Sequence, residues 1–192
     1  MLNKKEIIDN IKTLFYALII AIIIRSLIIQ PFYIPSSSME PSLLVGDRIF
    51  VTKYSYGYSK HSFPFSPPIF KDRIFSNKPE RGDIVVFKTP ADNRTDYIKR
   101  LIGLPGDQVQ FLDSNLYINN SEVIKSRLSS SDKIYCGTYN FDVYTFEENL
   151  PNGIKHKSVY LKNFPYDNSD PFVVPDDHYF FLGDTRDCSK YS

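Results

Sequence analysis

The sequence predicts a mostly β fold preceded by one N-terminal transmembrane helix. Aromatic residues make up 15% of the 192 residues, with 14 Tyr, 15 Phe and no Trp. This composition suits strands with half-buried faces. Several runs rich in β-branched and aromatic residues are opened by Gly-Asp turns, and one long apolar run lies near the N-terminus. The length fits one domain with an appendage.

Charge and cysteine content exclude several classes of function. With 23 basic and 22 acidic residues the net charge is +1. The protein therefore has no broad positive electrostatic field that would attract nucleic acid. Cys136 and Cys188 are isolated and lack metal-site spacing, so they imply neither a disulfide framework nor a zinc site, and their state stays open. No metal and no organic cofactor is expected.

The apolar run Leu14–Ile29 contains only Arg25 and Ser26 as polar residues. As a helix it covers about 24 Å, so flanking residues must extend it to cross a bilayer. We therefore expect a transmembrane helix over residues 13–33. The three lysines before the run place residues 1–12 in the cytoplasm and residues 34–192 outside, by the positive-inside rule.

A cleaved secretory signal is the alternative interpretation of this run. Ser36-x-Ser38 imitates the small-x-small cleavage pattern that follows such signals. Against cleavage, the run is longer than the usual apolar core of about 7–15 residues. Pro31 and Pro35 are also followed by sequence with the patterning of a folded domain.

Beyond the apolar run, the pattern predicts strands at Val45–Lys53 and Arg81–Pro90. Tyr54–Lys78 lacks a clear period and is expected to be a long loop. Its segment "FPFSPPIF" is suited either to resting on the membrane surface or to packing on its own domain.

The next segments carry clear turn signals. "DYIKRLIGLPGDQVQFLD" predicts strand, turn and strand, with Pro and Gly at the centre of a type II turn, and "NLYINNSEV" predicts a tight hairpin. Residues 126–170 have weak patterning and many Asn and Ser, so a variable, loop-rich β-insertion is expected within about residues 108–178. "HYFFLGD" predicts a final strand.

Ser38 is a candidate nucleophile because Pro35 and Pro41 hold its segment as a pre-set loop. A serine hydroxyl needs a base to take its proton, but no histidine lies in a triad context and no Gly-x-Ser-x-Gly elbow is present. Lys99 is the other possible base, since burial lowers the pKa of a lysine and supplies a neutral amine. The alternative is an edge-strand lysine that blocks aggregation.

Four segments, "IPSSSMEPSLLVGDRIFVTK", "RGDIVVFK", "YIKRLIGLPGD" and "GDTRDCS", occur in this order behind the apolar run. They resemble the conserved boxes of bacterial type I signal peptidases, also called leader peptidases. The resemblance covers nearly the whole chain after the helix. It implies coiled antiparallel β-sheets around one core with a smaller β-insertion, and a Ser–Lys catalytic dyad.

The resemblance also assigns roles to individual residues. It implies Ser38 as nucleophile and Lys99 as general base, with the Ser36 hydroxyl and the Ser38 backbone N–H as the oxyanion hole. Ser189 corresponds to the serine that orients the lysine. The surrounding structural loop holds Asp184, Arg186 and Asp187.

The last box departs from the family pattern. Among the departures, Thr185 replaces an asparagine, Tyr191 replaces an aspartate, and the sequence ends at Ser192 before the arginine that pairs with that aspartate. The loss of this ion pair is expected to loosen the loop of Ser189 and the placement of Lys99. A misplacement of about 1 Å can cost on the order of 100-fold in rate.

The sequence thus indicates a membrane-anchored serine endopeptidase that removes signal peptides from exported preproteins. The expected location is the bacterial inner membrane, with the catalytic domain on the periplasmic side; preproteins and the lipid bilayer are the expected partners. One alternative is a weakened or inactive relative that acts as a membrane-tethered binding module. Another is a related processing peptidase for pilus or conjugation proteins.

Overall fold

The computed structural model describes residues 3–63, 66–68, 72–137, 139–162 and 168–188. The chain forms two compact units. The first consists of residues 1–32 and 48–78, and the second of residues 33–47 and 79–192. The second unit carries every candidate site residue and is described in more detail.

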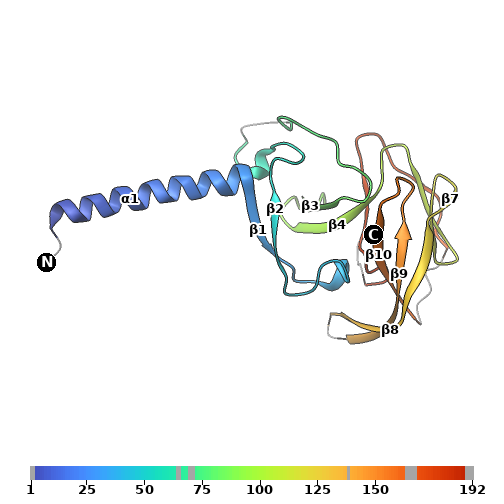
Figure 1. Cartoon of the computed structure of the whole chain (residues 1–192). Coiled ribbons are helices and arrows are strands. Elements are labelled where there is room, and N and C mark those ends of the chain that lie inside the picture. The colour runs from blue at the N-terminus through green and yellow to red at the C-terminus, as the bar shows by residue number, and fades with distance from the viewer. Residues whose placement is uncertain (1–2, 64–65, 69–71, 138, 163–167, 189–192) are drawn as a thin grey trace. The chain divides into compact units, whose positions relative to one another are not determined.

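The first unit begins with helix α1 (Lys4–Ile23), which continues as one π-helical turn, η1 (Ile24–Ile28). Asn3 caps the helix, and Glu6 completes a capping box. Together α1 and η1 have 25 residues, or about 37 Å at 1.5 Å per residue. Most of their apolar side chains are exposed, and Figure 1 labels the helix α1 near the N-terminus. By length and composition this helix can cross a membrane.

The bounds of this helix differ from the expected 13–33. It starts at Lys4 and ends at Ile28, and residues 29–33 form strand β1 (Ile29–Tyr33), which pairs with β2 (Arg48–Thr52). Pro31 has no N–H and clashes with the preceding helical turn, so the helix stops before it. The expected loop after β2 contains only a short 3₁₀ turn, η3 (Lys60–Ser62), and a bridge between Tyr58 and Ile74 among its described residues.

The second unit contains three antiparallel sheets. The first has the strand order β12 (Phe180–Leu182), β4 (Asp96–Gly103), β3 (Ile84–Lys88). The second has the order β11 (Phe172–Val173), β5 (Gln108–Leu112), β6 (Asn115–Ile118), β7 (Ser121–Glu122). The third has the order β10 (Lys155–Leu161), β9 (Tyr139–Asn149), β8 (Ile124–Cys136). The expected mostly β fold is confirmed.

Two turns follow the sequence signals closely. Between β4 and β5, Gly106 has φ +85° and the N–H of Asp107 donates to the carbonyl of Leu104 over 3.0 Å. These are the features of the expected type II turn. Between β6 and β7, Asn119 and Asn120 both have positive φ, which is the geometry of a tight two-residue hairpin.

The β-insertion expected around residues 126–170 is present, but its described residues are mostly strands and not loops. Most of it forms the long hairpin of β8 and β9 with β10 alongside (Figure 1). Two irregularities in the β8–β9 register, between Arg127 and Asp132, break the regular alternation of side chains. Aromatic pairing supports the sheet, since the rings of Phe146 and Tyr160 meet edge to face at 5.5 Å.

The main core of the second unit lies among β4, β5, β6 and β12. Its buried members are Ile102, Val109, Phe111, Leu116, Ile118, Val123, Leu150, Val174 and Leu182. A smaller cluster of Ile134, Val143 and Val159 lies in the β8–β9–β10 sheet. β4 contributes to the main core and therefore holds its own polar residues in fixed positions.

Candidate active site

The serine loop, residues 34–44, is fixed by its apolar residues. Ile34 is buried, its N–H donates to the Asp47 carbonyl, and its own carbonyl accepts from Gly46. Met39 is fully buried at the end of the 3₁₀ turn η2 (Ser37–Met39). Burial of Ile34 and Met39 holds the loop between them against the rest of the second unit.

Ser36 and Ser38 lie together on this loop. Ser36 is exposed and Ser38 is half-buried, with their hydroxyl oxygens 3.4 Å apart. Ser37, between them, is buried. Two serine hydroxyls thus share one accessible side of a constrained turn, as nucleophilic attack with nearby charge stabilisation requires.

Lys99 lies in the middle of β4, opposite Val85 of β3. The alternative of an edge-strand lysine is wrong, because β4 has β3 on one side and β12 on the other. Lys99 is 6% exposed. Burial lowers the pKa of its amine to about 8, although the negative charge of Asp184 acts to raise it. A neutral amine is therefore accessible near physiological pH.

Arg100 is a site residue that sequence reasoning did not single out. Its guanidinium makes a two-pronged ion pair with Asp184, through Nε to Oδ1 at 2.7 Å and Nη2 to Oδ2 at 2.8 Å. Nη1 donates to the Gly82 carbonyl, and Nη2 also lies 3.2 Å from Ser42 Oγ in the serine loop. The residue next to Lys99 therefore joins β4 to both the serine loop and Asp184.

Thr185 makes a second link to the serine loop. Its hydroxyl donates toward the carbonyls of Ser37 and Glu40, at 2.7 and 2.9 Å, and its backbone N–H donates to the Ser38 carbonyl at 3.2 Å. Asp184 and Thr185 are adjacent in the chain. Asp184 binds Arg100, the neighbour of Lys99, and Thr185 binds the backbone around Ser38.

Arg186 and Asp187 hold the rest of this segment, as expected for a structural loop. Arg186 is 1% exposed, and its Nη2 lies 2.6 Å from Oε2 of buried Glu148. Burial alone would raise the pKa of Glu148, but the charge of Arg186 and bonds from His156 and Tyr160 lower it. The Asp187 carboxylate accepts from the Leu161 N–H at 2.6 Å.

Residues 184–188 are bound at every position, whereas the expected loosening concerns the loop of Ser189. Thr185, one of the departures from the family pattern, is itself buried and hydrogen-bonded. Ser189 and Tyr191 lie outside the described residues, so the assignment of Ser189 remains a prediction. Among the residues that the structure describes, no group of three or more His, Cys, Asp or Glu side chains could hold a metal ion.

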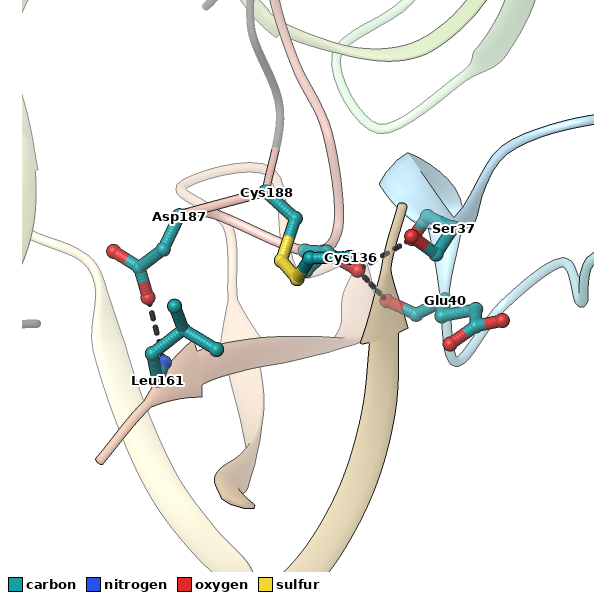
Figure 2. Close-up of a disulfide and its surroundings, with 7 residues drawn as sticks. Ser37, Glu40, Cys136, Leu161, Asp187 and Cys188 are labelled. Atoms are coloured by element: carbon teal, nitrogen blue, oxygen red, sulfur yellow. Dashed lines mark hydrogen bonds between the residues drawn. A yellow bond between two sulfur atoms is a disulfide. The ribbon is translucent and has the colours of Figure 1, made fainter. Parts of the chain in front are cut away.

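The two cysteines, whose state the sequence leaves open, are joined by a disulfide. Cys136, at the end of β8, is bonded to Cys188, and the Cα atoms are 5.6 Å apart (Figure 2). The two positions are 52 residues apart in the chain, so nothing local in the sequence signals the pairing. The bond ties the β8–β9 hairpin to the segment that carries Asp184 and Thr185.

Comparisons with known proteins agree with the resemblance seen in the sequence. The family model "Signal peptidase, peptidase S26" matches residues 7–192. A signal peptidase I of Rickettsia typhi is 43% identical over 99% of this chain and 74% of its own length. A signal peptidase I of Rickettsia bellii is 45% identical over 99% of this chain and 68% of its own length.

A solved structure of a signal peptidase I from Enterococcus faecalis is 30% identical and covers 60% of this chain and 84% of that one, with a TM-score of 0.34. The family model and the relatives both extend over nearly the whole chain. The chain therefore belongs to the signal peptidase family, peptidase S26, and is a serine endopeptidase of the signal peptidase I type.

Proposed function

We propose that this chain removes signal peptides from exported preproteins with Ser38 as nucleophile and Lys99 as general base. One observation carries the assignment: a buried lysine with a pKa of about 8 lies beside Arg100, whose guanidinium binds the serine loop and Asp184. Signal peptidase I relatives at 43–45% identity support the substrate class.

In the proposed reaction, the neutral amine of Lys99 takes the proton of the Ser38 hydroxyl as its oxygen attacks the scissile carbonyl. The Ser38 N–H and the Ser36 hydroxyl donate to the oxyanion that forms. When the intermediate collapses, the C–N bond breaks and Lys99 returns the proton to the leaving amine. Water, deprotonated by Lys99, then hydrolyses the ester on Ser38 and frees the enzyme.

We also propose that the N-terminal helix anchors the enzyme in the inner membrane, with the second unit on the periplasmic side. The support is the helix Lys4–Ile28, whose mean hydropathy reaches 2.1, and the lysines at its N-terminal end. Cleavage near Ser36-x-Ser38 is disfavoured, because the carbonyls of Ser37 and Ser38 are bonded to Thr185 within the fold. Anchoring would keep the enzyme in the same bilayer as the apolar core of its substrate.

The test uses the full chain in detergent, incubated with a preprotein, and N-terminal sequencing of the product. We expect Ser38→Ala and Lys99→Ala to abolish cleavage, and Ser36→Ala to reduce it on the order of 100-fold. The matched controls are Ser121→Ala, at an exposed strand serine, and Lys125→Ala, at a half-buried lysine whose pKa is also lowered. An unmodified chain that folds but does not cleave, or a Ser38→Ala variant that still does, contradicts the proposal.

A further inference from the structure

Five consecutive residues, 184–188, are each attached to a different part of the second unit. Their partners are Arg100 on β4, the serine loop, Glu148 on β9, Leu161 on β10 and Cys136 on β8. Figure 2 draws two of these attachments, the disulfide and the Asp187–Leu161 hydrogen bond, together with Ser37 and Glu40 of the serine loop. The backbone of this segment is therefore fixed on several sides.

Within this segment Thr185 reaches the backbone around Ser38. Its side chain is 1% exposed, and its hydroxyl proton is shared between the carbonyls of Ser37 and Glu40. The Ser37 carbonyl also accepts from the Glu40 N–H at 3.0 Å. Two donors thus hold one carbonyl oxygen, which leaves its peptide group little freedom to rotate.

The Ser37 carbonyl and the Ser38 N–H belong to the same planar peptide group. In a trans peptide the N–H points opposite to the C=O, so a fixed carbonyl direction also fixes the direction of the N–H. The Thr185 hydroxyl, on the carbonyl side, therefore aims the Ser38 N–H away from Thr185. That N–H is the backbone donor of the proposed oxyanion hole.

We propose that Thr185 is a positioning residue that holds the Ser38 N–H in the direction required for oxyanion binding. The proposal rests on the proposed function, in which that N–H stabilises the tetrahedral intermediate. Thr185 acts through the peptide and touches no reacting atom. Its effect therefore falls on stabilisation of the transition state and leaves substrate binding nearly unchanged.

The kinetic test compares Thr185→Val, which keeps the shape and loses the hydroxyl, with Thr185→Ser, which keeps the hydroxyl. We expect Thr185→Val to lower kcat on the order of 100-fold with KM changed less than about threefold. Thr185→Ser should keep kcat within about threefold of the unmodified chain. Thr145→Val is the matched control, because Thr145 is also buried but its hydroxyl donates to Asp132.

Equal kcat values for Thr185→Val and Thr145→Val overturn the proposal, as does a Thr185→Ser variant as slow as Thr185→Val. Backbone hydrogen exchange gives a readout that does not depend on activity. The Glu40 amide, which donates to the Ser37 carbonyl, should exchange at least about tenfold faster in Thr185→Val than in Thr145→Val. An unchanged exchange rate of the Glu40 amide overturns the positioning role of Thr185, whether or not the proposed function holds. Inactivity of the unmodified chain contradicts only the proposed function.

Discussion

Removal of the Cys136–Cys188 disulfide should lower the free energy of unfolding by about 4 kcal/mol. The bond closes a loop between residues 52 apart, and a loop of that length removes about 14 cal/mol/K of entropy from the unfolded chain. With an m-value of about 2–3 kcal/mol/M, the urea midpoint should fall by about 1.5–2 M. The change is made by Cys136→Ser together with Cys188→Ser.

The assay is urea unfolding of the full chain in detergent, followed by near-UV circular dichroism of its 14 Tyr, since the chain has no Trp. Cys136→Ser alone is the control and should match the double variant, because either change breaks the bond. Cleavage should fall less than with Thr185→Val, since residues 184–187 keep their other partners. Equal midpoints for the oxidised chain and the double variant would refute this reasoning.

Two buried ion pairs give further predictions from the same unfolding assay. Asp184→Asn leaves Arg100 without its carboxylate, and Glu148→Gln does the same to Arg186, so each should cost about 3–5 kcal/mol. Asp96→Asn, at a more exposed pair, should cost less than about 1 kcal/mol; similar losses for all three variants would contradict the role of burial. Because the folded-state pKa of Glu148 lies below its ordinary value of 4.5, its contribution is present above pH 4.5 and is lost as the pH falls further. The unmodified chain should therefore lose stability in acid more steeply than Glu148→Gln, and parallel losses would argue against it.

Local signals in the sequence were enough for much of the fold. The turn at Leu104–Asp107 was predictable because Pro and Gly at its centre restrict the backbone by themselves. Strands β3, β4 and β12 follow apolar and aromatic runs next to Gly-Asp turns. The sequence was enough to choose Lys99 as the base candidate. It did not show that Lys99 lies on the central strand of its sheet, because that depends on the pairing of β4 with the distant β12.

The missed features depend on partners far away in the chain. The β8–β9 hairpin was expected as a loop-rich β-insertion because its Ser- and Asn-rich strands show weak alternation, and their register is irregular. The Cys136–Cys188 bond spans 52 residues, and two isolated cysteines carry no pairing signal. Thr185 was noted only as a departure from the family pattern, and nothing local in the sequence shows that its hydroxyl bonds two carbonyls that lie 145 and 148 residues before it.

The pH dependence of kcat/KM tests the role of Lys99 most directly. Lys99 must be neutral to take a proton, so activity should rise with pH and reach half its maximum near the Lys99 pKa of about 8. Asp184 raises that pKa, so Asp184→Asn should move the rise to lower pH under conditions that keep it folded. If kcat/KM rises at the same pH in Asp184→Asn as in the unmodified chain, the assignment of Lys99 as the base is contradicted. The same holds if Lys99→Arg still shows this rise.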